Sequence, residues 1–368
     1  MRGGTTMKCM GFVLGSIQGN GGIARVVSLV ANELVKNPNI NIHIISFSIP
    51  EAEADYRYDE RIIMHRLYDS RISMTTAILK KHAIKKLAEI IDKNDIDIVV
   101  ACGELFFPLS ILASKKRNTK CWCWEHSNPA GTTDHKFQAI CRKFAVQNAD
   151  KIIVLTKSAE KYYCDEFKTK ATKIVQIYNP VDQLAFSTNR IIQKENKIIS
   201  IGRLTFQKNF QNLIEIASQV LFDNAWTWDI YGEGEDRQEL EEMIKERGLN
   251  DRVRLMGQVS NLYEVYPKYS IQVMTSRYEG FPMSLLEGEA NGLPLVSYDI
   301  PTGPNEIIVN NVNGILIEAG NTQEMVKVIR YLIADSSARY EMSQNSLKMA
   351  KRFSIISIIK EWEKMIYE

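Results

Sequence analysis

Two glutamates, Glu279 and Glu287, have the residue type and spacing for chemistry, because they flank the point where an apolar strand runs into a helix. The run 271–275 predicts a buried strand. Pro282 favours a helix start, since its missing N–H would be unpaired at a first helical position. At this separation the carboxylates cannot easily share one proton or one metal ion, but each can accept hydrogen bonds from a pair of hydroxyl groups. The same pattern would arise if Glu279 were only a charged loop residue and Glu287 a solvated helix residue.

The helix expected to open at about Pro282 would favour a bound anion. Its first backbone N–H groups, around Met283 to Leu285, have no partner inside the helix, and the positive end of the helix dipole lies there. We therefore expect Glu279 on the loop at the mouth of an anion site, with Glu287 about one turn inside the helix.

This segment resembles the acidic motif of retaining GT-B glycosyltransferases of glycosyltransferase family 4. The matching residues are Glu279, Gly280, Phe281 and Glu287. The resemblance implies that Glu279 binds hydroxyls of the donor sugar and Glu287 those of the ribose. It also implies that backbone amides near Ser284 and Leu285 help to hold the diphosphate.

A second match, Gly202-Arg203-Leu204-x3-Lys208, follows the apolar run 197–201. The resemblance implies that Arg203 and Lys208 bind the donor diphosphate. A guanidinium and an ammonium suit a pyrophosphate whose negative charge grows as the sugar leaves. The alternative is a pair of solvated loop cations. Because both motifs occur in the order and at the separation found in the family, we favour the diphosphate site.

Weaker matches extend the resemblance over nearly the whole chain. Gly232 lies where a strand ends and a helix over 236–247 begins, and Val259 belongs to a loop that the family places against the nucleobase. The segment 301–308 resembles a variant found in many bacterial surface-polysaccharide transferases.

In the amino-terminal half, two short motifs carry the resemblance. Gly21 and Gly22 precede a helix over 23–35, and such a pair lets backbone N–H groups approach a phosphate or a sugar. His126 follows the strand 120–124 and matches an active-site histidine that would meet the sugar's 6-hydroxyl. A lone histidine after a strand is more often structural, so both motifs depend on the resemblance.

Composition sets limits on the function. The 368 residues favour two domains, and the 45% hydrophobic and 24% charged content is ordinary for a globular protein. A net charge of +2 is too small for a nucleic-acid binder. The six cysteines lack paired spacing, which argues against a metal site or disulfide scaffold and favours a reducing cytosol. No apolar run is long enough to predict a transmembrane helix.

Apolar runs alternate with helical patterns along the chain, which is typical of parallel sheets covered by helices. We expect an α/β GT-B fold: two doubly wound Rossmann-like domains that face each other across a cleft. The acceptor domain would span 1–185 with a crossing terminal helix at 353–368, and the donor domain 186–352. Strands are expected to begin near residues 7, 41, 97, 119, 151, 173, 197, 226, 253, 271, 294 and 314.

A helix expected over 73–93 carries a basic face. Lys80, Lys81, Lys85 and Lys86 lie on it beside an apolar stripe. Such a helix could contact anionic lipid headgroups, although a solvated helix on a globular domain looks much the same.

These expectations describe a retaining, metal-independent glycosyltransferase without a cofactor. It would move a hexose or N-acetylhexosamine from a nucleotide sugar, by frequency a UDP-sugar, to a glycan or polyprenyl-diphosphate-linked saccharide in surface polysaccharide synthesis. We expect it in the cytoplasm, with peripheral contact at the inner face of the plasma membrane. A GT-B nucleotide-sugar epimerase and a non-catalytic GT-B partner subunit are the alternatives.

Overall fold

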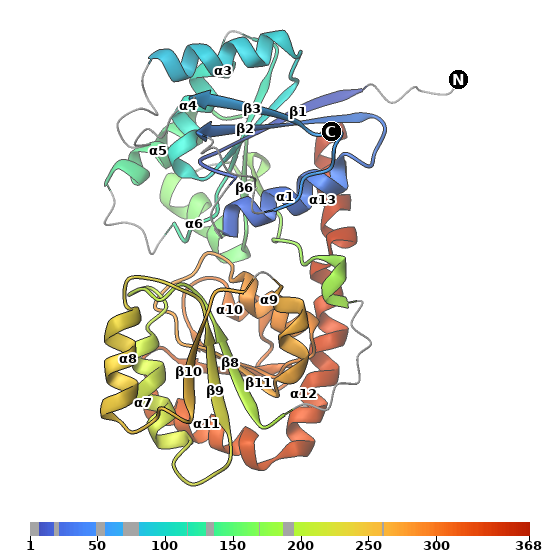
Figure 1. The fold of residues 1–368 in the computed structure, drawn as a ribbon. Helices are drawn as coiled ribbons and strands as arrows, with labels where there is room; N and C mark the ends of the chain where they lie inside the picture. Colours follow the sequence, from blue (N-terminus) through green and yellow to red (C-terminus); the bar gives the residue numbers. More distant parts are fainter. Residues whose placement is uncertain are drawn as a thin grey trace. The chain divides into compact units, whose positions relative to one another are not determined.

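The computed structural model describes residues 7–17, 22–48, 56–68, 81–115, 117–129, 136–168, 170–186, 195–259 and 261–368 (Figure 1). The chain forms two compact units. Unit 1 comprises Met1–Pro180 and Ile355–Glu368, and unit 2 comprises Val181–Ser354. The divisions therefore differ by a few residues from the expected ones at 185 and 353. One reason is that the Val181 N–H donates to the Phe353 carbonyl at 2.7 Å, which ties both ends of unit 2 together.

Unit 1 contains a seven-stranded parallel sheet of order β3-β2-β1-β4-β5-β6-β7. The strands are β1 Lys8–Leu14, β2 Ile40–Ser48, β3 Ile63–Tyr68, β4 Ile98–Cys102, β5 Lys120–Trp124, β6 Lys151–Val154 and β7 Ile174–Gln176. The central strands are continuously apolar because helices cover both faces of the sheet. Cys121 and Cys123 lie in this core. All six cysteines, each in the described part of the chain, are free.

The strand β3 was missing from our sequence predictions. It is an edge strand, and most of its residues are exposed or half-buried, including Ile63 and Met64. Because one face and one edge of β3 are not covered by the core, its sequence Ile-Met-His-Arg-Leu-Tyr has neither a buried apolar run nor a clean alternation.

The helices of unit 1 are α1 Gly22–Leu34, α3 Lys81–Lys93, α4 Phe107–Ser114, α5 Lys136–Asn148, α6 Lys157–Phe167 and α13 Ile355–Tyr367, with short 3₁₀ turns η1 Glu104–Phe106 and η2 Ala171–Lys173. The terminal helix α13 packs against α1, as Figure 1 shows within unit 1. Its Trp362 ring lies 5.9 Å from Phe12 and 4.7 Å from Trp124. These contacts explain why the last helix belongs to unit 1.

The basic helix α3 packs its apolar stripe into the core of unit 1. Leu87, Ile90 and Ile91 are buried there, whereas Lys81 and Lys85 are exposed. Residues 73–80 of the expected helix, including Lys80, lie outside the described residues. The described part of α3 therefore presents charge, and no apolar stripe, to the surroundings.

Unit 2 contains a six-stranded parallel sheet of order β10-β9-β8-β11-β12-β13. Its strands are β8 Lys197–Ile201, β9 Thr227–Tyr231, β10 Val253–Gly257, β11 Ile271–Met274, β12 Leu295–Asp299 and β13 Gly314–Glu318. Its helices are α7 Phe210–Val220, α8 Arg237–Glu246, α9 Met283–Ala290, α10 Pro304–Ile307, α11 Thr322–Ala334 and α12 Ser336–Met349, with 3₁₀ turns η3 Gln183–Phe186, η4 Leu262–Glu264, η5 Tyr266–Lys268 and η6 Ala350–Phe353.

Both sheets are doubly wound, which confirms the expected fold class. In each, the strand order reverses beside the first strand of the unit: β1 lies next to β4, and β8 lies next to β11. Ligands of such sheets bind outside the carboxyl ends of the strands at this reversal. The loops after β8 and β11 are the ones that carry the two strongest sequence motifs.

Candidate active site

The loops that follow β8 and β11 are bonded to each other in unit 2. The Thr275 hydroxyl donates to the Lys208 carbonyl at 3.1 Å. The Arg277 N–H donates to the Gln207 carbonyl at 2.8 Å, and the Gln207 amide donates to the Tyr278 carbonyl at 2.9 Å. Since each strand fixes one end of its loop, these bonds hold the two motifs in one relative position.

Lys208 and Glu279 form an ion pair across these two loops. Their Nζ and Oε1 atoms are 2.5 Å apart, and the side chains are only 16% and 9% exposed. Removal from water strengthens this attraction relative to that of a surface pair. The Glu279 carbonyl also accepts a hydrogen bond from the Thr302 hydroxyl. The structure thus brings together two residues that the motifs predicted.

Arg203 lies on the same loop as Lys208 but is not part of this ion pair. Its side chain is exposed. Among the described residues it has no hydrogen bond or ion pair. Its guanidinium is therefore available to an incoming anion.

Two of the predicted glycines, Gly202 and Gly232, are explained by packing between loops. A Cβ on Gly232, where φ is +144°, would lie 1.9 Å from the Gly202 carbonyl oxygen. A Cβ on Gly202 would lie 2.9 Å from Cδ of Lys208. A side chain at Gly232 would force the backbone at Gly202 to move, and one at Gly202 would displace the Lys208 side chain.

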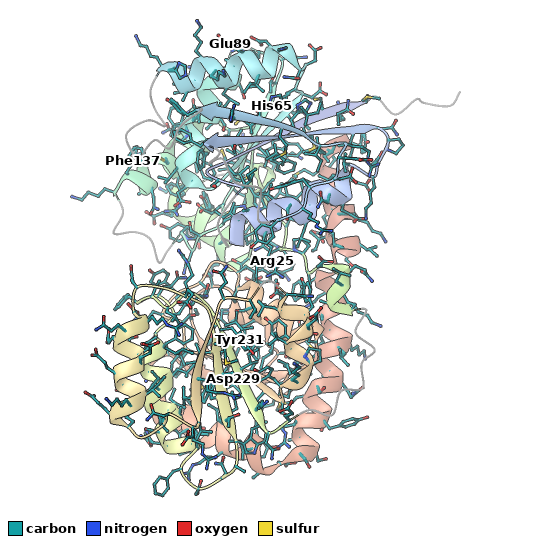
Figure 2. All side chains as sticks on the ribbon, in the orientation of Figure 1. Arg25, His65, Glu89, Phe137, Asp229 and Tyr231 are labelled. Atoms are coloured by element: carbon teal, nitrogen blue, oxygen red, sulfur yellow. The ribbon has the colours of Figure 1, made fainter. Side chains whose placement is uncertain are left out.

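The strand end before Gly232 is fixed by a buried polar network. The hydroxyls of Tyr231 and Tyr269 are 2.9 Å apart, and the Tyr269 hydroxyl donates to Asp229 at 2.6 Å (Figure 2 labels Tyr231 and Asp229). The Arg254 guanidinium donates twice to the same carboxylate, at 2.7 and 2.9 Å. This network holds the carboxyl end of β9 in place. It thereby also holds the loop that follows β9, whose Gly232 packs against Gly202.

The start of α9 differs in detail from the expectation. Pro282 is the N-cap, with φ −74° and ψ 108°, and Met283 is the first helical residue. We predicted that the Leu285 N–H would be free to bind an anion. It instead donates to the Pro282 carbonyl at 3.1 Å. Within the described residues, the N–H groups of Met283 and Ser284 have no backbone acceptor. Of the three expected N–H groups, those of Met283 and Ser284 therefore remain available to an anion and that of Leu285 does not.

Glu287 is buried, which excludes the reading that it is a solvated helix residue. It is 1% exposed, and its Oε2 atom accepts a hydrogen bond from the Tyr266 hydroxyl at 3.2 Å. The same hydroxyl lies 3.0 Å from the Ser284 carbonyl. Tyr266 thus joins η5 to α9. A ribose could reach Glu287 only after the atoms that cover it had moved.

Phe281 anchors the glutamate loop. It is 5% exposed, and its ring meets that of Phe353 at 5.5 Å and 70°. Gly303 lies against the same loop, with φ +99°, and a Cβ there would be 3.3 Å from the Gly280 carbonyl oxygen. We did not predict roles for Thr302 and Gly303. The segment 301–308, noted only for its resemblance, was the available signal.

Val259 lies half-buried beyond β10, and Ser260 next to it is outside the described residues. The Gly257 carbonyl at the end of β10 accepts from the Gly232 N–H at 2.9 Å. The loop predicted to face a nucleobase therefore begins beside Gly232, which packs against Gly202. Its nucleobase contact stays a prediction.

In unit 1, His126 follows β5 as expected. Its half-buried ring lies 4.4 Å from Trp124, and its Nε2 atom is covered and lacks a partner among the described residues. Burial lowers the pKa of His126 to about 3, although the Glu125 carboxylate acts in the opposite direction. The ring therefore stays neutral at physiological pH and can act as a hydrogen-bonding group, but it does not deliver a proton as an imidazolium.

Gly22 begins α1, and a Cβ added there would have no atom of the described residues within 4 Å. Packing against the described part of the chain therefore does not require glycine at this position. The neighbouring Gly21 lies outside the described residues. A close approach by a ligand remains the predicted reason for Gly22.

Sequence reasoning also missed a buried ion pair in unit 1, between Glu125 and Arg142 at 2.7 Å. The available signal was a carboxylate directly after the apolar run 121–124. No group of three or more His, Cys, Asp or Glu side chains that could hold a metal ion occurs among the residues placed in the structure. No helix in that same part of the chain is long and apolar enough to cross a bilayer.

Comparisons with known proteins agree with this architecture. A family profile described as "Glycosyl transferases group 1" matches residues 182–349, and one described as "Glycosyltransferase Family 4" matches residues 20–183. An uncharacterized glycosyltransferase of Haemophilus influenzae is 30% identical over 97% of this chain and 99% of its own length.

Two further proteins extend the comparison. A Campylobacter jejuni enzyme is 26% identical over 98% of this chain and 99% of its own. It is named GalNAc-α-(1→4)-GalNAc-α-(1→3)-diNAcBac-PP-undecaprenol α-1,4-N-acetyl-D-galactosaminyltransferase. A mutant of TarM from S. aureus, crystallised with fondaparinux, α-GlcNAc-glycerol and UDP, aligns with a TM-score of 0.82 and 18% identity over 98% of this chain and 100% of that one. The chain therefore belongs to the family 4 glycosyltransferases and has their GT-B fold.

Proposed function

We propose that this glycosyltransferase is a retaining enzyme that moves a hexose or N-acetylhexosamine from a UDP-sugar to a glycan or a polyprenyl-diphosphate-linked saccharide. The observation that carries the proposal is the Lys208–Glu279 pair, held on bonded loops at the strand reversal of unit 2. A cation for a diphosphate and a carboxylate for sugar hydroxyls lie side by side there.

Unit 2 would bind the donor. Arg203 is exposed and without a partner in the described residues, so it can bind phosphate oxygens without first losing a contact. The N–H groups of Met283 and Ser284 can receive an anion at the start of α9. Lys208 can then turn from Glu279 toward the diphosphate, which leaves the Glu279 carboxylate for the hydroxyls of the sugar.

The chemical step would break the bond between the anomeric carbon and the diphosphate oxygen. The acceptor hydroxyl attacks from the same face, which retains the anomeric configuration, and the departing diphosphate oxygen takes the acceptor's proton. Lys208 and Arg203 stabilise the negative charge that develops on the leaving group. A metal ion is not required in this scheme, because side-chain cations supply the charge.

The named relatives support the acceptor assignment and the donor assignment. The C. jejuni relative carries an undecaprenol-diphosphate saccharide in its name, and the TarM structure contains UDP. We assign acceptor binding to unit 1, where His126 is expected to meet the sugar's 6-hydroxyl. A cytoplasmic enzyme with peripheral membrane contact fits such a lipid-linked acceptor.

Calorimetric titration with UDP, GDP and ADP, followed by a panel of UDP-sugars, tests the donor. We expect UDP to bind most tightly, and we expect binding without added divalent ions and in the presence of a chelator. NMR of the product's anomeric centre then tests retention. Tighter GDP or ADP binding, or an inverted product, would contradict the corresponding part of the proposal.

The same panel separates the two alternatives. An epimerase would release an epimer or free sugar with no acceptor present. A non-catalytic subunit would bind no UDP-sugar. The site in unit 2 argues against the second alternative. Lys208 and Glu279 form a partly buried pair at the edge where ligands bind, and the exposed Arg203 beside them has no structural role in the described part of the chain, so a ligand site explains it better.

A further inference from the structure

Two buried carboxyl groups lie at the carboxyl ends of neighbouring strands in unit 1. Glu104 begins η1 just after β4, and Glu125 directly follows β5. The register pairs Cys102 with Trp124, and the Gly103 N–H donates to the Trp124 carbonyl at 2.9 Å. Glu104 is 8% exposed and Glu125 is 1% exposed. Charged residues are buried in this way only when they are paired or neutral.

Glu125 is paired with Arg142 of α5. The guanidinium donates to Oε2 at 2.7 Å, and the Tyr163 hydroxyl of α6 donates to the same oxygen at 2.8 Å. Burial raises the pKa of Glu125, but Arg142 and the hydrogen bonds outweigh it, so the net pKa is lowered and the group is ionised. Glu125 is therefore the carboxylate of this cluster.

The other oxygen of Glu125 closes a turn around His126. Oε1 accepts from the Ser127 N–H at 3.2 Å and from its hydroxyl at 2.5 Å. The Glu125 N–H donates to the Ile153 carbonyl of β6 at 2.8 Å. The residues on both sides of His126 are therefore fixed by the sheet and by the ion pair. The direction of the imidazole depends on this turn and on the Trp124 ring beside it.

The hydrogen bonds of Ser127 bear on the protonation state of Glu104. A serine hydroxyl has one proton to donate and two lone pairs. Its proton goes to Glu125 at 2.5 Å, and Arg142 donates to one lone pair at 2.8 Å. The Oε2 atom of Glu104 lies 3.4 Å from the same hydroxyl oxygen. With the Ser127 proton given to Glu125, a hydrogen bond between Ser127 and Glu104 would need Glu104 as the donor, and therefore in its neutral form.

We propose that Glu104 acts as a neutral carboxylic acid that donates to Ser127, and that the Glu104–Ser127–Glu125–Arg142 cluster positions His126 for the acceptor-side chemistry. The inference rests on the proposed function of His126. Glu104 is a positioning residue in this account, since it acts through Ser127 and does not touch the substrate.

The groups that face Glu104 agree with this assignment. They are Glu125 after β5, and Arg142 and Cys141 on α5. Tyr163 of α6 joins the cluster through its hydrogen bond to Glu125. Burial, followed by the Glu125 charge, raises the pKa of Glu104 to about 7, and burial raises the pKa of Cys141 to about 11. Burial also raises the pKa of Tyr163 well above its ordinary value. Of these groups, Glu104 has the pKa closest to neutrality.

The experiment compares Glu104→Gln with Glu104→Leu. The glutamine amide can donate to Ser127 as the acid does, so we expect the kcat of Glu104→Gln to stay within about twofold of the wild type. The wild type should lose kcat above pH 7 as Glu104 ionises, whereas Glu104→Gln should not. Leucine cannot donate, so we expect kcat to fall by about 10–100-fold, by analogy with residues that orient a metal-ligating histidine. UDP binding should not change in either variant. An inactive, folded Glu104→Gln variant would show that the carboxylate is needed and would overturn the proposal.

A second readout does not depend on activity. In protein with ¹³C-labelled histidine, we expect the His126 ring signal to shift with a midpoint near pH 7 and to become pH-independent in Glu104→Gln. The control is Glu289→Gln, which alters a buried carboxyl group of unit 2 and should leave that shift unchanged. A flat His126 signal in the wild type would overturn the coupling. If the shift occurs but no sugar transfer is found, the proposed function fails while the cluster assignment stands.

Discussion

Lys208 and Glu279 meet at 2.5 Å although they lie on different loops, one after β8 and one after β11. The ion pair means that, without ligand, the cation expected to bind the diphosphate is neutralised by the carboxylate expected to bind the sugar. Donor binding must therefore replace the contact between Lys208 and Glu279 with contacts from Lys208 to the diphosphate and from Glu279 to the sugar. This relationship makes the two residues interdependent and shapes the first two predictions.

Replacing Lys208 with alanine should lower turnover by about 10²–10³-fold, by analogy with the loss of one oxyanion donor. It should also destabilise the protein, because Glu279 is left as a partly buried, unpaired carboxylate. The double variant Lys208→Met, Glu279→Gln should recover thermal stability without recovering turnover. Steady-state kinetics and melting curves measure both effects. More than about a tenth of wild-type kcat in Lys208→Ala would contradict the diphosphate assignment.

The two glutamates should separate in binding experiments. We expect Glu287→Gln to weaken UDP binding by about 1.5–3 kcal/mol, the value of a lost charged hydrogen bond. Glu279→Gln should leave UDP binding intact and weaken only the UDP-sugar. Calorimetry with both ligands measures the difference. Because Glu287 is 1% exposed, unchanged UDP affinity in Glu287→Gln would mean that its role is the structural bond to Tyr266.

Gly22 offers a test in which stability and activity move in opposite directions. A Cβ at this position meets no atom of the described residues within 4 Å, so Gly22→Ala should fold normally and gain up to about 1 kcal/mol of helix stability. If a phosphate or sugar approaches the Gly22 backbone, the same methyl group should raise the donor KM. A melting temperature at or above the wild-type value with unchanged kinetics would remove Gly22 from the site.

Glu289 predicts a pH-dependent stability difference. It is fully buried, and burial raises its pKa to about 8, although Arg352 at 3.7 Å and the Asn313 amide at 2.8 Å act against this. The unfolded carboxyl titrates near pH 4.3. Between these values the unfolded state ionises first, so the wild type loses stability as pH rises.

Glu289→Gln cannot ionise and should escape that loss. Relative to the wild type, its free energy of unfolding should rise by a few kcal/mol between about pH 4.5 and 8, at 1.36 kcal/mol per pKa unit. Urea unfolding at pH 5 and pH 8 gives the comparison. A constant difference between the two proteins across this range would show that Glu289 is ionised in the folded protein.

Membrane contact through α3 should be purely electrostatic in origin. Its apolar stripe is buried, and Lys81 and Lys85 are exposed on the same helix as Glu89, whose outward position Figure 2 shows. We expect binding to anionic liposomes at low salt, worth up to about 1 kcal/mol per lysine, and its loss at high salt. Changing Lys80, Lys81, Lys85 and Lys86 to glutamine should abolish it without affecting UDP binding. Sedimentation of the wild type with liposomes that shows no binding at low salt would make α3 an ordinary solvated helix.

The sequence determined the fold class and most of the elements, because buried parallel strands are continuous apolar runs and the helices that cover them are periodic. Twelve expected strands correspond to strands of the structure, within about one residue at their starts. The family motifs also named Lys208 and Glu279. The strand β3 could not be found in this way, since an exposed edge strand needs neither pattern.

Tertiary structure alone decided how the predicted residues are used. It closed the Lys208–Glu279 pair, engaged the Leu285 amide with Pro282, and buried Glu287 under Tyr266. It also assembled Glu104, Glu125 and Arg142 into one cluster. Each of these contacts joins residues from different strands or loops, or depends on the backbone angles of a cap. Residue type and local spacing do not specify such distances, because they arise only when separate elements pack together.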